Sequence, residues 1–236
     1  MRLFLLPLLA LATVAAQSPA TERRTVMITA FERMRVDGPF VVKVTSGGPP
    51  GAVIAADRRA AQQIGIRNIG GQLVIGARDA GFEGWNASDG PATILVSARD
   101  LRAVTINGGG RVEVDRLRGQ RVDLGVNGAG TLTIGTLDAD QLAVTLTGTG
   151  AIALNGGLAR TARFNTHGAG SIDAVGLSVN DLTVNSQSAG DSRFTARYTA
   201  AVSTLGTGAV RVLGNAACRL AGPGPAQCAG KTERRR

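Results

Sequence analysis

Apolar and polar residues alternate along the second half of the chain, as in Val122, Leu124 and Val126 followed by Leu132 and Ile134. An alternation with period two predicts β-strands, because successive side chains of a strand point to opposite faces. Helical spacing fits none of these stretches, and residues 57–63 form the lone candidate helix. The pattern therefore predicts an all-β chain.

The same alternation returns every twenty residues, which indicates one structural unit stacked on copies of itself. Residues of one column in such a stack point the same way, so a column of apolar residues marks the interior. The columns that we assign to the interior are all even-numbered: Val104, Leu124, Val144, Phe164 and Val184; Val112, Leu132, Ile152, Ile172 and Ser192; Val114, Ile134, Leu154, Ala174 and Phe194; Ile106, Val126, Leu146, Thr166 and Ser186.

Glycines mark the corners of this unit. Gly110, Gly130, Gly150, Gly170 and Gly190 lie twenty residues apart, and Gly108, Gly128, Gly148, Gly168 and Ser188 precede them by two positions. Gly206 and Gly208 continue the series two residues early, which predicts a tighter corner or the end of the stack. Since glycine alone enters positive φ without penalty, we expect these Gly-x-Gly pairs to form structural turns.

The predicted fold is a right-handed parallel β-helix-like solenoid with coils of about 20 residues and strands roughly 4.8 Å apart. A less regular β region should precede it, with strands at residues 25–30, 34–36, 40–45, 52–55, 64–66 and 73–75. We expect one domain over residues 25–215, followed by a C-terminal cap and basic tail over residues 216–236.

The first sixteen residues have the features of a secretory signal peptide. Arg2 is followed by an apolar run over residues 3–11 and then by Val14, Ala15 and Ala16. The run is too short to span a bilayer, and no second long apolar run follows. The mature chain is therefore expected in the periplasm or at the cell surface, without a transmembrane segment.

Cys218 and Cys228 are the only cysteines, and they flank the Gly-Pro-Gly-Pro sequence at residues 222–225. An exported chain meets conditions that permit oxidation, so we expect a disulfide that closes this loop. The alternative, a metal site, lacks ligands, because His167 is the single histidine and no acidic cluster accompanies the cysteines. No metal and no cofactor are expected.

The net charge of +9 indicates anionic partners, such as envelope polymers or lipid headgroups. Nucleic acid is not an expected partner, because aromatic residues make up only 3% of the chain and are not interleaved with the basic ones. Envelope proteins, glycans and a second copy of the chain remain as candidate partners.

Candidate chemistry is sparse on the outward columns. They offer no pair of carboxylates in register on neighbouring coils, so we expect no enzyme and no catalytic residue. Phe82 and Trp85 stand in the longest irregular stretch and are candidate ligand contacts, although such aromatics can also fold back over a domain end. His167 falls in a polar column, where it is either a rung of a hydrogen-bonded ladder or a proton donor.

Three segments carry a family resemblance: FERMRVDGPFVVKV at residues 31–44, GQLVI at 71–75 and LRAVTINGGG at 101–110, followed by the Gly-x-Gly rows. Together they resemble the head GIN domain family, whose members bear the label of autotransporter adhesins. The resemblance implies an exported bacterial β-helical domain of the cell envelope and supplies no catalytic residues. The predicted function is a binding or adhesion module; the alternatives are a self-associating structural protein and a polysaccharide-acting enzyme.

Overall fold

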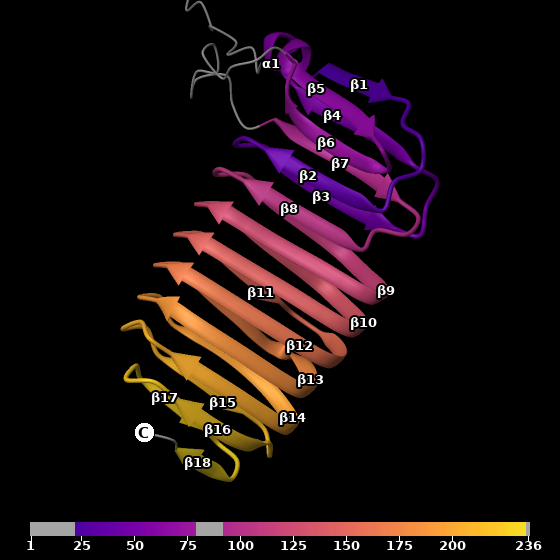
Figure 1. Cartoon of the computed structure of the whole chain (residues 1–236). Helices are drawn as coiled ribbons and strands as arrows, with labels where there is room; N and C mark the ends of the chain where they lie inside the picture. Colours follow the sequence, from indigo (N-terminus) through magenta and orange to yellow (C-terminus); the bar gives the residue numbers. More distant parts are fainter. Residues whose placement is uncertain (1–21, 79–91, 235–236) are drawn as a thin grey trace, which may run out of the picture.

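The computed structural model describes residues 22–78 and 92–234, and these form one elongated stack of strands (Figure 1). The predicted signal peptide, residues 1–16, and the candidate contacts Phe82 and Trp85 lie outside the described residues. The model confirms the predicted all-β parallel solenoid, which makes about six turns.

The described residues of the N-terminal region, 22–78 and 92–98, form seven strands and a short helix. Their bounds are β1 Glu22–Val26, β2 Arg33–Asp37, β3 Val41–Ser46, β4 Gly51–Ala56, α1 Arg58–Gln63, β5 Ile64–Ile69, β6 Gln72–Ala77 and β7 Thr93–Ala98. The predicted helix is confirmed. Its first turn is capped by Asp57, whose carboxylate accepts a hydrogen bond from the backbone N–H of Ala60 (2.8 Å).

The remaining strands build the coils. They are β8 Ala103–Asn107, β9 Arg111–Gly128, β10 Thr131–Gly148, β11 Ala151–Leu154, β12 Gly157–Gly168, β13 Ser171–Ser188, β14 Ser192–Thr204, β15 Val210–Leu213, β16 Ala217–Ala221, β17 Ala226–Cys228 and β18 Thr232–Arg234. Neighbouring coils pair in parallel with a shift of twenty residues, for example Leu132 with Val112 and Val144 with Leu124.

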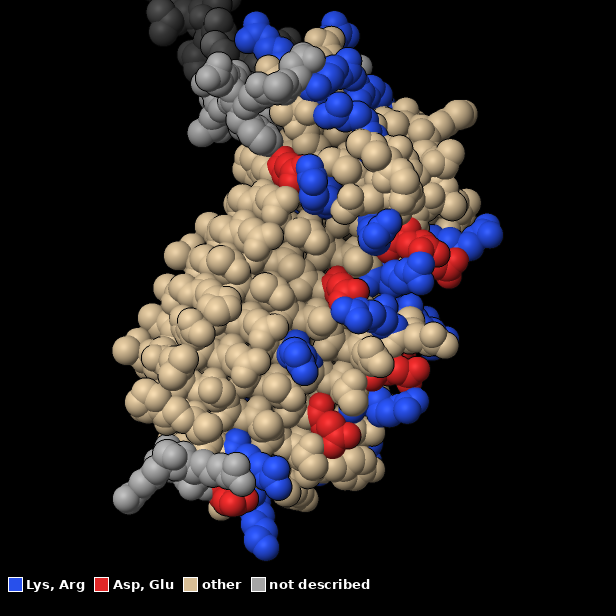
Figure 2. Space-filling view, viewed as in Figure 1, with Lys and Arg blue, Asp and Glu red and all other residues tan. Residues whose placement is uncertain are grey.

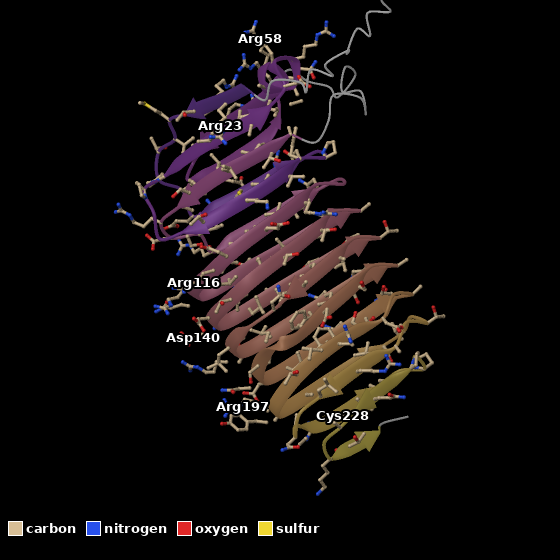
Figure 3. The ribbon with its side chains drawn as sticks, turned by 180° about the vertical axis from the view of Figure 1, so that it is seen from behind. Arg23, Arg58, Arg116, Asp140, Arg197 and Cys228 are labelled. Atoms are coloured by element: carbon tan, nitrogen blue, oxygen red, sulfur yellow. A yellow bond between two sulfur atoms is a disulfide. The ribbon has the colours of Figure 1, made fainter. Side chains whose placement is uncertain are left out.

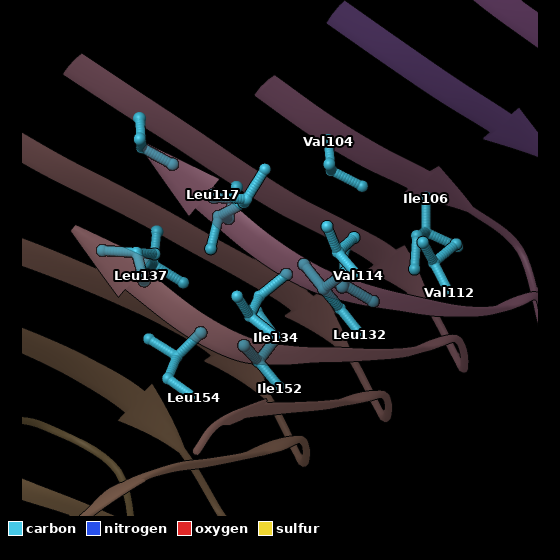
Figure 4. Close-up of a cluster of buried hydrophobic side chains, with 14 of the residues drawn as sticks. Val104, Ile106, Val112, Val114, Leu117, Leu132, Ile134, Leu137, Ile152 and Leu154 are labelled. Carbon is cyan, nitrogen blue, oxygen red and sulfur yellow. The ribbon is translucent and has the colours of Figure 1, made fainter. Parts of the chain in front are cut away.

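Each full coil has three sides, which we call the first, second and third. In β9 they comprise residues 111–114, 116–119 and 121–128, because pairing with β10 is interrupted at residues 115 and 120. The predicted even-numbered columns are buried on the first and third sides. The second side instead buries odd-numbered residues, Leu117, Leu137 and Leu177, because the inward parity changes at the corner before this side and changes back at the corner after it. Figure 4 shows Leu117 and Leu137 beside even-numbered core residues such as Val114 and Ile134.

The strands do not stack in chain order at the N-terminal end. β2 lies between β6 and β8, and β3 lies between β7 and β9, all in parallel. Beyond them, β4 and β5 add antiparallel edges, and β1 pairs with β4 at the outermost position. The regular solenoid therefore begins at β2 and β3, and residues 51–78 and 92–98 extend it outward (Figure 1).

The two glycines of each corner have different roles, and the expectation of positive φ is wrong for the second one. The first glycine of each pair, Gly108, Gly128, Gly148 and Gly168, has a φ between 100° and 119°. The second glycine of each pair, such as Gly150, does not have positive φ. It is required for another reason: a Cβ on Gly150 would lie 2.9 Å from Val126 Cγ1 and even closer to the carbonyl oxygen of Gly130.

The coils shorten towards the C-terminus. Strand β14 has no residues that pair with Val175, Gly176 and Leu177 of β13, and it has one extra residue near Tyr198. The shift between paired residues therefore falls from twenty to eighteen, and it stays at eighteen between β14 and β16. The two residues are lost between Phe194 and Thr199, whereas the corner at Gly206 and Gly208 keeps the length of the corner before it, because Ser186 pairs with Thr204 and Ser192 with Val210. The expectation of a tighter corner at these glycines is therefore wrong. The predicted disulfide is confirmed: it joins Cys218 on β16 to Cys228 on β17.

Replacing Gly150 with alanine should destabilise the fold by about 1–3 kcal/mol, because the added methyl group must displace the coil beneath it. Gly109→Ala is the matched control, since a Cβ there meets nothing within 4 Å and its φ is not positive. Urea denaturation followed by circular dichroism measures both changes. Equal stability of the two variants would show that the close approach at Gly150 does not matter.

Candidate functional site

The third side of the solenoid presents a flat array of uncharged polar side chains. We call it the polar face, and its members are the outward, odd-numbered residues Thr105, Asn107, Asn127, Thr145, Thr147, Asn165, His167, Asn185, Gln187 and Ser203. Figure 2 shows a broad surface without charges over these strands, bounded by a band of mixed charge along one edge. Repetition with a spacing of roughly 4.8 Å makes each column a row of similar hydrogen-bonding groups.

Amide side chains of the polar face bind one another between coils. Asn127 Nδ2 donates to Asn107 Oδ1 (3.0 Å), and Asn107 Nδ2 donates to Asp37 Oδ1 (2.6 Å). Asn185 Nδ2 donates to Asn165 Oδ1 at 3.0 Å in a second column. These bonds fix the orientation of the amides, so the face is arranged before any ligand arrives.

His167 lies in the first of these columns, in register with Thr147 and Gln187 on the adjacent coils, and it is exposed. Its position matches the polar column predicted from sequence. Its surroundings are hydroxyl and amide groups, so the structure assigns it a place in an array of hydrogen-bonding groups.

A groove runs along the solenoid axis at the edge of the polar face, where the second and third sides meet. Two hollows of about 480 and 500 Å³ share Asp181 and Thr183, and together they form what we call the axial groove. The backbone of residues such as Leu182 and Ala200 forms its floor. Its walls are two outward columns, Arg121, Gln141, Thr161, Asp181, Thr199, Ala217 and Lys231 on one side and Ala143, Arg163, Thr183, Ala201, Arg219 and Glu233 on the other.

Most charges along the axial groove have partners. Arg121 Nε lies 3.2 Å from Asp123 Oδ2, and this hydrogen bond raises the pKa of Arg121 above its ordinary value. Asp181 Oδ1 accepts a hydrogen bond from Thr199 Oγ1 (2.6 Å), and Arg219 lies 3.8 Å from Glu233. The groove therefore offers alternating donors and acceptors and no strong field of one sign.

The acids of the groove are far apart for hydrolysis. Asp181 is three coils from Asp123 and three coils from Glu233, or about 14 Å by the coil spacing. Glycosidases place their two carboxyl groups about 5 to 10 Å apart. Among residues 22–78 and 92–234, no three His, Cys, Asp or Glu side chains gather as they would around a metal ion.

A smaller hollow of about 390 Å³ lies on the first side and brings two acids, Asp173 and Asp191, near Arg193 and Arg211. Asp173 pairs with Arg193 (2.5 Å), and Asp191 accepts a hydrogen bond from the backbone N–H of Ala209 (2.8 Å). Both carboxylates therefore form contacts that join adjacent coils.

Sequence reasoning found the polar columns but missed the axial groove. Its sequence signal is weak: Ala143, Thr183 and Ala201 are small residues of one column, but Arg163 stands in the same column. The columns also extend to Asp37 of β2, which was not expected. The motif Val36-Asp37-Gly38, which parallels Ile106-Asn107-Gly108, could have revealed this extension.

The fold and this surface define the chain as a β-solenoid with an uncharged polar face and an adjoining groove. Residues 30–216 match the family described as "Putative auto-transporter adhesin, head GIN domain". The chain belongs to this family, which confirms the resemblance predicted from sequence. The described residues contain no helix that is long and apolar enough to cross a membrane.

Solved structures share the fold at low sequence identity. A putative adhesin from Bacteroides fragilis superposes with a TM-score of 0.80 at 20% identity, covering 89% of this chain and 97% of its own. A putative adhesin from Parabacteroides distasonis has a TM-score of 0.71 at 17% identity, with the same two coverages. A putative lipid binding protein from P. distasonis has a TM-score of 0.62 at 14% identity, covering 91% and 95%. No curated protein matches the sequence significantly.

Replacing Asn107 with aspartate should destabilise the protein by about 1–3 kcal/mol at neutral pH, because two carboxylates would then face each other between Asp37 and residue 107. Protonation at acidic pH removes the repulsion, so the difference from wild type should shrink as the pH falls. Urea denaturation at neutral and mildly acidic pH measures this, with Thr147→Asp in the same column as the control. A loss that does not change with pH would contradict the observed contact.

Proposed function

We propose that this chain is an exported, non-catalytic binding module of the cell envelope that recognises an extended glycan along its polar face and axial groove. The observation that carries the proposal is the stacking of uncharged hydroxyl and amide side chains in register over successive coils. A ligand on this surface meets the same kind of group at each step of roughly 4.8 Å. Such periodic contacts favour a long polymer with repeating polar groups.

The chemistry of the face favours sugar hydroxyls. Thr145, Asn165 and Gln187 can each donate and accept hydrogen bonds, as sugar hydroxyls do. The charged groups near the groove are paired or hydrogen-bonded in several places, as with Arg121 and Asp123. An uncharged or weakly charged glycan therefore fits this surface better than a polyanion does.

Membership of a family described as putative auto-transporter adhesins, and likeness of fold to a solved putative adhesin, support a binding role at the cell surface. The wide separation of the groove carboxylates supports a role without catalysis. We keep two finer predictions within this proposal. One places the binding function in a single domain over residues 25–215, and the other makes Phe82 and Trp85 additional ligand contacts.

Removing two hydroxyls from the polar face should weaken glycan binding. The double substitution Thr145→Ala and Thr147→Ala removes neighbouring outward hydroxyls from the third side of β10, and we expect the Kd to rise about tenfold. Thr131→Ala with Thr133→Ala is the matched control, because it makes the same change on the first side of the same strand. An array of bacterial envelope polysaccharides identifies the ligand, and calorimetry then measures each Kd.

Two outcomes would overturn this proposal. One is the absence of any retained glycan for the wild-type chain, and the other is an equal loss of binding in the two double variants. Light scattering on the same samples tests the alternative of a self-associating structural protein. If the wild-type chain assembles and the variant with Thr145→Ala and Thr147→Ala does not, self-association through the polar face is favoured over glycan binding.

A further inference from the structure

The N-terminal end of the solenoid is far more basic than its body. Residues 22–28 and 57–78 contain six arginines against two acids, Glu22 and Asp57. Residues 103–230, which form the coils, contain ten cations against eight acids. Figure 2 shows the resulting cluster of basic side chains at this end of the molecule. We call the six residues the arginine end: Arg23, Arg24, Arg58, Arg59, Arg67 and Arg78.

Several arginines of the coils form ion pairs with carboxylates, unlike some arginines of the arginine end. Several pair with an acid on the adjacent coil, as Arg160 does with Asp140 (3.0 Å) and Arg193 with Asp173 (2.5 Å). In the described part of the chain, Arg23, Arg67 and Arg78 form no ion pair with a carboxylate, and all three are exposed. Their charge is therefore available to an external anion.

A hollow of about 470 Å³ opens among these arginines, between residues 24–27 and residues 64–67. Arg24, Arg67 and Arg78 line it together with the apolar residues Val26, Met27, Ile64 and Ile66. Arg24 also donates a hydrogen bond to the carbonyl oxygen of Ile64 (3.1 Å), which holds the two walls together. The hollow thus combines guanidinium groups with an apolar lining.

Apolar side chains also project from this end. Met27 is 99% exposed and Ile69 is 63% exposed, and Met27 belongs to the hollow itself. An exposed apolar side chain beside basic residues suits the interfacial region of a membrane, where apolar groups are buried and anionic headgroups attract cations. Soluble polyanions have no apolar region that could bury Met27.

We propose that the arginine end docks on an anionic phospholipid surface, with phosphates on the arginines and acyl chains against Met27. Guanidinium groups bind phosphate oxygens through two parallel hydrogen bonds, which suits several arginines around one hollow. The proposal does not depend on glycan binding, because the polar face lies along the side of the solenoid and the arginine end lies at its tip. Docking in this way directs the long axis away from the membrane (Figure 1).

Vesicle co-sedimentation of the mature chain tests this proposal. We expect binding to phosphatidylcholine vesicles that contain phosphatidylglycerol, no binding to pure phosphatidylcholine, and a loss of binding as salt rises. The triple substitution Arg23→Gln, Arg67→Gln and Arg78→Gln should weaken binding roughly 100-fold, since each basic residue near an anionic surface contributes about fivefold.

The matched control removes three arginines from the coils: Arg116→Gln, Arg197→Gln and Arg211→Gln. Figure 3 shows Arg116 and Arg197 along a corner of the stack, away from Arg23 and Arg58 at its end. We expect this variant to bind like the wild type. Equal losses in the two triple variants would overturn the proposal, because they would indicate a general effect of net charge.

Met27→Ser separates a membrane from a soluble polyanion. We expect this variant to bind anionic vesicles more weakly than wild type and to bind heparin unchanged. Wild-type protein that binds heparin but not anionic vesicles would overturn the proposal and favour an anionic polysaccharide at the arginine end. Melting temperatures of all variants identify any loss that comes from misfolding.

Discussion

Parallel stacking of each coil on its own copy, at a spacing of roughly 4.8 Å, is the constraint on which this structure depends. Every residue then has its equivalent from the neighbouring coil as a neighbour, so a residue type must be compatible with itself. Glycine meets this demand at the corners: a Cβ on Gly130 would lie 2.8 Å from Ile106 Cγ2 and 2.9 Å from the carbonyl oxygen of Gly110. Asparagine meets it on the surface, because one amide donates to the next.

The same constraint explains what could be predicted from sequence. Because equivalent residues stack on one another, the sequence repeats every twenty residues. This repeat identified the interior columns of the first and third sides and the corner glycines. The second side was missed because Leu117 and Leu137 are odd-numbered, and a parity rule fails wherever a corner reverses the inward face. Positive φ was expected for the Gly-x-Gly pairs as a whole but occurs only at the first glycine, because spacing does not distinguish a turn residue from one that avoids a clash.

Long-range order at the N-terminal end could not be predicted for a different reason. β2 joins the stack beside β8, so Val36 pairs with Ile106 seventy residues away, and only five residues carry the pairing. A five-residue match is too short to predict strand pairing when the residues do not belong to the twenty-residue repeat. The axial groove was also not predicted, since no motif marks it and its walls come from two outward columns of mixed residue type.

Charge is the property that stacking restricts most severely. Identical charges repeated on successive coils would repel one another at short range, and the coils avoid this by placing an acid beside a base, as at Asp140 and Arg160. The polar face avoids it by being largely uncharged. At the N-terminal end, β1 and β5 are the last strands of the described stack, so Arg23, Arg67 and Arg78 gather there without a stacked copy among the described residues. The chemistry of the side and that of the tip therefore differ because of the fold itself, and a substitution in one leaves the other intact.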